Sequence, residues 1–547
     1  MPFADARRID RDLISADLCI VGAGAAGITI AREFIGTSLR VVLAESGDFA
    51  FRHAPQLLYR GRNIGLPSFS IAKSRLRRFG GSTTRWAGQC RPLDPIDFEA
   101  RDWIPNSGWP FDRQHLDPYY ERAQTICSLG PYNYSPDAWH DVDGGPLALG
   151  SEALEARMYQ FSQRPDFGTA YRPELEQADN IDVLLNANLV EIETREPVRH
   201  VDALRFATLN GRDFRVQARA YVIACGGIEN ARVLLASNRV ATRGIGNEHD
   251  LVGRYFMDHP FFFMGAFEPA HARFDRSFHV IEKYGVQRVN AAFGMTERRQ
   301  RQERLNGASV YFIRRPRSKT MGPYFSPGGK AFARLIEVLR HDELPDGRLL
   351  NDVREAAIGI KDVVSTVTRQ AAETLNPRPV LVLRATVEPT PERTSRVVLD
   401  RSWDRLGIPR ANVDWRMRAD DRRGLDRLLE LLRIELPHAA LGRVIDSDCG
   451  DDGDWPGSMS GGKHHMGTTR MHDDPMQGVA DGNARVHGFE NLFIAGSSLF
   501  PTAGYANPTL TIVALALRLA DHLMGTLRGN LAVSYTMSKA RGAGPDI

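Results

Sequence analysis

Apolar runs separated by a glycine-rich turn open the chain and predict alternating strands and helices. Residues 17–21 (DLCIV) predict a short strand, and residues 28–34 (ITIAREF) predict a helix after the turn GAGAAG. A second apolar run, 40–44 (RVVLA), predicts the next strand. This order of elements is typical of an α/β domain built on a parallel sheet.

Five short apolar runs in the middle of the chain predict strands with turns between them. The last of them continues directly into Cys225-Gly226-Gly227. We interpret the group as a β-meander of the kind that FAD-binding Rossmann domains insert between their halves and that NAD domains usually lack. The predicted strands are 181–185, 189–193, 201–207, 214–218 and 221–224.

Composition indicates a globular protein whose partners are small molecules. The chain has 547 residues, 42% hydrophobic and 25% charged, which is large enough to need two cores. Its 70 basic and 67 acidic residues nearly cancel to +3, so it lacks the one-signed field that binding of nucleic acid or an anionic membrane needs. We therefore expect no nucleic-acid partner and no membrane insertion, and the sequence leaves a homo-oligomer open.

Cysteine usage and the N-terminus predict a cytoplasmic protein. Five scattered cysteines without C-x-x-C spacing argue against a disulfide framework and against a zinc site. No apolar segment follows the charges of MPFADARRIDRD, so no secretory signal is predicted. No apolar run approaches the roughly 20 residues that a membrane helix needs.

The glycine turn carries a dinucleotide signature. Gly22, Gly24 and Gly27 tighten the turn, let main-chain N–H groups approach a pyrophosphate and let the helix lie close to its strand. Glu45 follows the next strand, 23 positions after Gly22, where a carboxylate accepts hydrogen bonds from a ribose and repels a 2′-phosphate. FAD or NAD is thus favoured over NADP, and an ordinary tight turn with an incidental surface glutamate is the alternative.

Two further stretches combine glycine with polar side chains. Residues 79–88 (FGGSTTRWAG) suit a loop against a cofactor, although taken alone an ordinary surface loop is the better interpretation. Residues 464–472 (HHMGTTRMH) and 491–511 (NLFIAGSSLFPTAGYANPTLT) bring titratable and amide groups to predicted strand ends, where open α/β sheets bind ligands.

A histidine in the first of these C-terminal stretches is the candidate base for alcohol oxidation. An ordinary pKa of about 6.5 leaves the ring mostly neutral and able to take a hydroxyl proton. Spacing alone does not separate His464 from His465, and a solvated or core histidine is the usual alternative for either. Asn507 is a candidate to orient the substrate oxygen, but Asn-Pro is also an ordinary turn. No metal-ligand spacing and no nucleophile elbow is present.

Together, GAGAAG with its acid, FGGSTTRWAG, CGGIENARVLLAS and the two C-terminal stretches resemble the flavin-dependent glucose–methanol–choline (GMC) oxidoreductase superfamily. Within it the chain resembles the sugar-oxidising branch, with pyranose oxidases, fructose dehydrogenase large subunits and aminoglycoside dehydrogenases. The resemblance implies FAD as the cofactor, His464 as the catalytic base and Asn507, 43 positions later, as the second active-site residue. The cofactor-binding residues that it implies are Gly22, Gly24, Gly27, Glu45, Gly81, Ser82, Thr83, Ala87, Leu189, Gly496, Ser497, Pro508 and Thr509.

One position departs from the pattern of some sugar oxidases. These enzymes carry a histidine in an S-T-H-W stretch that bonds covalently to the flavin, whereas STTRW has Arg85 there. Because arginine cannot form that bond, we expect non-covalent FAD.

The resemblance also implies an α/β fold class with two domains. An FAD-binding Rossmann-type domain would take residues 1–100, 180–260 and 455–530, and an α+β substrate domain on a mostly antiparallel sheet would take 101–179 and 261–454, before a tail over 531–547. Apolar runs predict substrate-domain strands at 380–388, 395–400 and 411–415 and an amphipathic helix at 421–436.

Two segments of the implied substrate domain have two interpretations each. Residues 266–378, rich in Arg, Gly and Pro and including RRPRSKTMGPYFSPGGK, are interpreted as lid and loop, with partner docking as the weaker interpretation. Asp258-His259-Pro260 either borders the active site or holds a satisfied structural histidine, and the second is favoured.

The implied reaction is oxidation of a hydroxyl of a sugar, glycoside or cyclitol-like alcohol to the carbonyl. His464 takes the O–H proton, Asn507 hydrogen-bonds the oxygen, and hydride passes to flavin N5, with reoxidation by oxygen or, slightly favoured, another electron acceptor. The alternatives are non-oxidative chemistry on the same fold, as in lyases or decarboxylases, and a catalytic subunit that depends on an electron-transfer partner.

Overall fold

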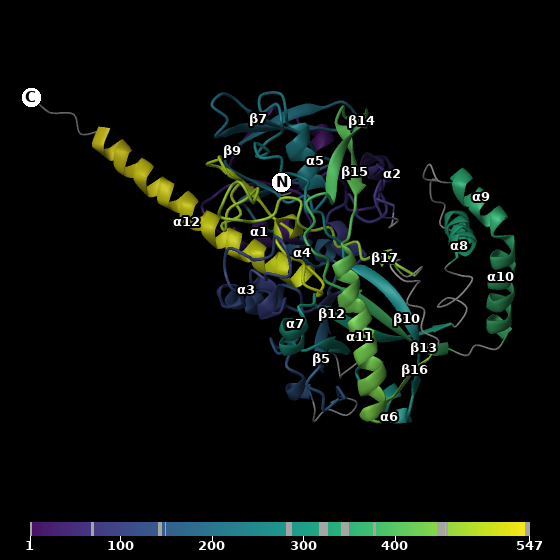
Figure 1. Cartoon of the computed structure of the whole chain (residues 1–547). Helices are drawn as coiled ribbons and strands as arrows, with labels where there is room; N and C mark the ends of the chain where they lie inside the picture. Colours follow the sequence, from purple (N-terminus) through teal and green to yellow (C-terminus); the bar gives the residue numbers. More distant parts are fainter. Residues whose placement is uncertain are drawn as a thin grey trace, which may run out of the picture.

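The chain folds around two sheets, each with its own apolar core (Figure 1). The computed structural model describes residues 3–541 except 67–69, 140–144, 148, 281–286, 317–325, 341–348, 376–378, 446–454 and 456–457. Within these residues each sheet has eight strands, the first mainly parallel and the second antiparallel. The predicted α/β fold class is confirmed.

The first sheet has the doubly wound arrangement of a dinucleotide-binding domain. The central residues of its parallel strands, such as 18–21 and 41–44, are continuously buried because helices cover the sheet, among them α1 (Ala25–Glu33) and α12 (Thr509–Arg541). An antiparallel meander extends one side. The strand order is β1 (Phe3–Asp5), β6 (Ile181–Leu185), β3 (Val41–Ala44), β2 (Leu13–Val21), β9 (Asp213–Ile223), β8 (Val201–Ala207) and β7 (Asn188–Thr194), with β18 (Leu492–Ile494) also on β9.

The second sheet carries the other core. Helix α11 (Ala419–His438) lays a leucine face on it, with Leu425, Leu428 and Leu432 fully buried there. The strand order is β16 (Gly442–Ile445), β10 (Pro260–Pro269), β13 (Pro379–Val387), β12 (Ala308–Pro316), β11 (Arg288–Met295), β5 (Leu154–Phe161) and β4 (Gln89–Cys90), with β17 (Ser460–Gly461) on β10.

The remaining elements connect and cover these sheets. Helices α8, α9 and α10 stand together to one side of the second sheet (Figure 1). The bounds are α2 (His53–Gln56), α3 (Arg113–Ile126), α4 (Phe167–Glu176), α5 (Glu229–Ala236), α6 (Ala272–Asp275), α7 (Glu297–Glu303), α8 (Pro327–Arg340), α9 (Leu349–Ile358), α10 (Ile360–Leu375), β14 (Arg396–Trp403) and β15 (Pro409–Asp414).

The predicted meander is wrong in two details. The predicted strands 214–218 and 221–224 are one strand, β9, which ends at Ile223, because Arg219-Ala220 contains no turn-forming residue. The pattern of apolar and polar residues changes along β9 because its start pairs with β8, whereas its end pairs with β18. Strand β6 is not in the meander either: it pairs in parallel with β1 and β3.

The predictions for the second half also need correction. Residues 266–378 are not mainly loop, since they contain β11, β12 and α6–α10; residues 317–325 of the segment RRPRSKTMGPYFSPGGK lie outside the described part. Strands β14 and β15 do not join the second sheet. They form a separate hairpin, and Val397 and Val413 pack into the first core.

The last helix differs from the sequence expectation as well. It continues to Arg541 and so takes up most of the predicted tail. By length and composition alone, Thr509–Arg528 would suffice to cross a membrane, which the sequence analysis did not anticipate. In the structure 61% of its most apolar stretch is buried, and α12 packs against α1 and α3, as a core helix does. The predicted domain boundaries stay a prediction.

Candidate active site

The turn between β2 and α1 has the close packing that a dinucleotide site requires. Gly22 has φ +102°, and a Cβ there would lie 2.6 Å from the Ala224 carbonyl oxygen. A Cβ on Gly27 would lie 1.9 Å from the Gly22 oxygen, so only glycine lets α1 lie this close to its strand. A Cβ on Gly24, in contrast, would meet no protein atom within 4 Å.

The acid that follows β3 is fixed beside this turn. Glu45 is buried, and its carboxylate accepts hydrogen bonds from the main-chain N–H of Ala23 (3.0 Å) and of Gly47 (2.8 Å). Main-chain donors hold the carboxylate at the end of the strand, where an adenosine ribose binds in this fold.

A cavity of about 530 Å³ begins at this turn and gathers most of the predicted site residues. Gly27 is the exception, since it packs under the turn instead of lining the cavity. The predicted residues that line it are His464, Asn507, Gly22, Gly24, Glu45, Gly81, Ser82, Thr83, Ala87, Leu189, Gly496, Ser497, Pro508 and Thr509, and His465 lines it too.

The loop of residues 79–88 docks directly on the dinucleotide turn. The Gly80 N–H donates to the Ala23 carbonyl (2.8 Å), and Thr83 Oγ1 donates back to Gly80 (2.6 Å). Thr83 Oγ1 in turn accepts from the Phe167 N–H at the start of α4 (3.2 Å). The small hydroxyl residues therefore fix the shape of a cavity wall, and do not form an ordinary surface loop.

The segment that carries His464 lies between two other chain segments. Met466 and Met257 pair by main-chain hydrogen bonds on one side, and Ser497 Oγ donates to the His465 carbonyl (2.7 Å) on the other. The buried Asp258 carboxylate accepts from the main-chain N–H of His464 (2.7 Å) and of Lys463 (3.2 Å). Burial raises the pKa of Asp258 to about 7 despite these donors.

The two adjacent histidines have different surroundings. His464 is half-buried in the cavity wall, with its ring against those of His259 and Phe261. Burial, aided by His259, His465 and Arg384, holds the pKa of His464 well below its usual range. The His465 ring is buried against Phe256, and burial lowers its pKa to about 3. Both rings are therefore neutral near pH 7.

Asn507 lies two residues before the start of α12, whose first residue, Thr509, also lines the cavity. Within the part of the chain that the structure describes, the Asn507 side chain makes no hydrogen bond. Its amide is thus available to a ligand, beside a helix N-terminus that favours negative charge.

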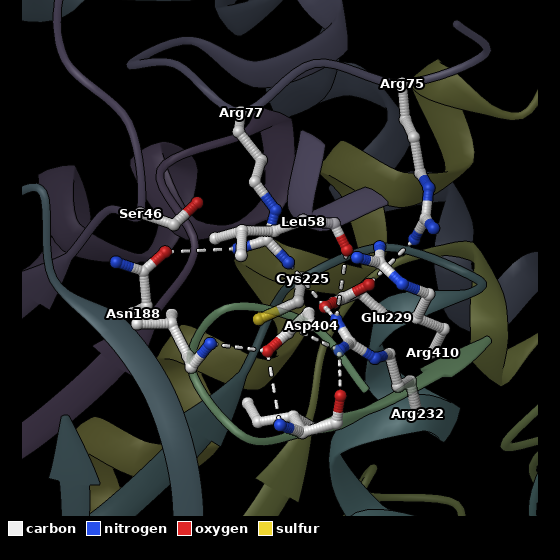
Figure 2. Close-up of polar contacts among 12 residues, drawn as sticks. Ser46, Leu58, Arg75, Arg77, Asn188, Cys225, Glu229, Arg232, Asp404 and Arg410 are labelled. Atoms are coloured by element: carbon white, nitrogen blue, oxygen red, sulfur yellow. Dashed lines mark hydrogen bonds and ion pairs between the residues drawn. The ribbon is translucent and has the colours of Figure 1, made fainter. Parts of the chain in front are cut away.

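A buried ion cluster that the sequence analysis did not single out forms part of the cavity wall. Figure 2 shows Arg75, Arg77 and Arg232 converging on Glu229, at 2.9, 2.5 and 2.7 Å respectively. Arg232 also donates to Asp404 (2.6 Å). Although burial opposes it, the three guanidinium groups lower the pKa of Glu229 to about 2.

Part of this cluster could have been found from the sequence. Glu229 and Arg232 lie in the motif CGGIENARVLLAS, which the sequence analysis quoted without assigning a role to either charge. Arg384 on β13, which lines the cavity with its guanidinium 3.9 Å from the Phe261 ring centroid, gave no signal because it stands in an otherwise apolar strand. Within the described residues no carboxylate pairs with Arg384.

The residues present fit FAD. The opening at Gly24, the N-terminus of α1 and the fixed Glu45 carboxylate match the pyrophosphate and ribose of its ADP half. The wall formed by residues 81–87 and the start of α12 would hold the flavin half.

Comparison with known proteins finds similarity to oxidoreductases. Residues 391–516 match the family model described as GMC oxidoreductase. The chain is 26% identical to 6'''-hydroxyparomomycin C oxidase of Streptomyces lividus, over 93% of this chain and 92% of that protein. It is 22% identical to the fructose dehydrogenase large subunit of Gluconobacter japonicus, over 95% and 100%.

The fold is likewise shared with solved structures. Pyridoxine 4-oxidase from Mesorbium loti superposes with a TM-score of 0.58 at 16% identity, covering 93% of this chain and 99% of that one. A formate oxidase superposes with a TM-score of 0.54 at 18% identity, covering 94% and 99%. Residues 391–516 thus carry the GMC oxidoreductase match, and over most of its length the chain is similar to oxidases and dehydrogenases that act on alcohol groups.

Proposed function

We propose that this enzyme oxidises a hydroxyl group of a sugar, glycoside or cyclitol-like alcohol to the carbonyl, with His464 as the base. The observation that carries the proposal is that His464 and Asn507 line the same cavity as the dinucleotide turn. The names of similar proteins support the substrate class, since they include an aminoglycoside oxidase and a fructose dehydrogenase subunit.

The roles of the two side chains follow from their surroundings. His464 is neutral near pH 7, so it can accept the hydroxyl proton of the substrate. The Asn507 amide donates a hydrogen bond to the substrate oxygen, which gains negative charge as the proton leaves. FAD, when bound, supplies the acceptor for the hydride that leaves the carbon.

Two finer points belong to the proposal. Arg85 stands where some sugar oxidases attach their flavin, so FAD is held without a covalent bond. Reoxidation is by oxygen or by another electron acceptor, and a cytoplasmic location stays a prediction of the sequence.

The test is anaerobic titration of the FAD-loaded protein with sugars, glycosides, aminocyclitols and simple alcohols. We expect one class to remove the oxidised-flavin absorbance, and its deoxy analogue, which lacks the reacting hydroxyl, to leave the absorbance unchanged. A flavin-loaded protein that none of these alcohols reduces would contradict the proposal.

A further inference from the structure

His259 lies directly behind the candidate base. It follows Asp258 just before β10, and only 1% of its surface is exposed. Its Nδ1 is 2.9 Å from Nδ1 of His464, and its Nε2 is 2.8 Å from the carbonyl oxygen of Gly504. The two imidazole rings are nearly perpendicular, at 86°.

The carbonyl fixes which nitrogen of His259 carries the hydrogen. A carbonyl oxygen only accepts hydrogen bonds, so Nε2 of His259 must be the donor to Gly504. Burial lowers the pKa of His259 to about 4, which keeps the ring neutral near pH 7. A neutral imidazole has one N–H, and Nδ1 of His259 is therefore an acceptor.

This acceptor determines the state of His464. The 2.9 Å contact between the two Nδ1 atoms needs one hydrogen, and His259 cannot supply it. The hydrogen must therefore be on Nδ1 of His464. Because His464 is neutral as well, its Nε2 is unprotonated, and the geometry of an imidazole ring turns Nε2 away from His259.

We propose that His259 is a positioning residue that holds His464 in the tautomer whose Nε2 is free to accept the substrate's hydroxyl proton. The role rests on the function proposed above and extends it to a residue that touches neither substrate nor cofactor. When His464 takes the proton, its Nδ1–H donates to His259 from a charged ring, which strengthens the bond and stabilises the cation as it forms. The Gly504 carbonyl and His259 thus fix the tautomer of His464 and stabilise its cation. A buried carboxylate has the same two effects on the histidine base of a Ser-His-Asp triad.

Asp258 does not fix the tautomer of His464. Its carboxylate accepts from the main-chain N–H groups of Lys463 and His464 and so anchors the segment; in the described part of the chain it makes no hydrogen bond to either ring. The tautomer of His464 is set by the ring of His259 alone among the described residues.

Two variants of His259 separate the acceptor role from simple packing. His259→Asn puts an amide oxygen near the position of Nδ1, where it can still accept from His464. His259→Gln reaches the position of Nε2 and can still donate to Gly504, but it offers His464 no acceptor. Both variants remove the ring. If His259 served only for packing, the two variants would therefore impair the protein to the same degree.

The first measurement is of the tautomer itself. FAD-loaded protein labelled with ¹⁵N-histidine is examined by NMR, and the His464 signals are identified by their loss in His464→Gln. We expect a protonated Nδ1 and an unprotonated Nε2 for His464 in the parent protein and in His259→Asn, and loss of this single state in His259→Gln. A parent protein with an unprotonated Nδ1 on His464 would overturn the proposal, whether or not any variant folds.

The second measurement is the rate constant of anaerobic flavin reduction at saturating substrate. We expect a loss of about 10- to 100-fold in His259→Gln and at most about 3-fold in His259→Asn. His438→Gln, at the exposed end of α11, is the matched control and should react like the parent. Equal losses in the two His259 variants would refute the positioning role. If no alcohol reduces the parent protein, the proposed function fails, and the NMR result still decides the tautomer.

Discussion

At the scale of single residues, the chemistry proposed for the cavity depends on keeping His464 neutral. Burial is the main cause, and the nearby His259, His465 and Arg384 add to it, since each makes a positive charge on His464 less favourable. A histidine with a pKa well below its usual range stays unprotonated at neutral pH, so His464 can act as the proposed base without alkaline conditions.

This state predicts the pH dependence of flavin reduction. Because the pKa of His464 is lowered, the rate constant should stay level near pH 7 and fall only below the ordinary histidine pKa of about 6.5, as the ring gains a proton. Arg384→Met removes one charge that opposes protonation, so the decline should move to higher pH. Stopped-flow reduction across the acidic range tests this, with the exposed Arg423→Met as the control. A decline at the same pH in Arg384→Met and the control would contradict the role of Arg384.

At the scale of elements, the ion cluster around Glu229 ties α5 to the loop that carries Arg75 and Arg77. The three guanidinium groups have little access to water, so each needs the carboxylate as its partner. The cluster therefore stabilises the wall at the adenosine end of the cavity.

Glu229→Gln should be strongly destabilising. Neutralising the shared carboxylate leaves buried arginines without a compensating charge, which costs about 3–5 kcal/mol in the free energy of unfolding. Glu176→Gln removes an exposed partner of Arg172 on α4 and should cost at most about 1 kcal/mol. Denaturant unfolding of the two variants measures the difference, and equal stabilities would show that the cluster is not structural.

The turn before α1 gives a second prediction at this scale. Gly24→Ala should leave the thermal stability of the FAD-free protein unchanged, since no protein atom lies within 4 Å of the added Cβ. The methyl group instead enters the cofactor cavity, so FAD should bind about 10-fold more weakly or worse, a difference of about 1.4 kcal/mol. Gly525→Ala, at an equally open position on α12, should leave FAD affinity unaltered. Unaltered FAD affinity in Gly24→Ala would place the cofactor elsewhere.

The sequence predicted the elements that have strict local rules and missed those set by distant contacts. The glycine turn, Glu45 and the helix α11 follow from spacing and periodicity and were placed correctly. The division of β9 into two strands was wrong because its pattern depends on β18, some 270 residues later in the chain. The helices α8–α10 were read as loop because the Arg, Gly and Pro around them dominated the composition.

The same limit applies to the site. His464 and Asn507 were predicted from their motifs, and the structure brings them to one cavity. His259 was interpreted as a satisfied structural histidine, which is true of its hydrogen bonds and yet incomplete, because one partner is the candidate base. A single sequence carries no signal for a contact between residues 205 positions apart.

At the scale of the whole molecule, the cavity draws its walls from both sheets. Phe261 and Arg384 come from β10 and β13 of the second sheet, whereas the dinucleotide turn belongs to the first. Bound FAD should therefore hold the two parts together, because a ligand that binds only the folded state stabilises it.

Non-covalent FAD should be removable and its removal should lower the melting temperature. Acid precipitation should release all the flavin into the supernatant, because Arg85 cannot form the covalent bond. Adding FAD back at about 100 times its Kd should restore about 2.7 kcal/mol of stability. Flavin absorbance that stays with the precipitated protein would show a covalent bond at some other residue.

The most direct test of the central claim is the rate constant of anaerobic flavin reduction in His464→Ala, at the same FAD content as the parent protein. If His464 takes the hydroxyl proton, reduction by the best alcohol of the panel should slow by about 100-fold or more, while His438→Ala reacts like the parent. An unchanged rate constant in His464→Ala would show that another group, or none, acts as the base.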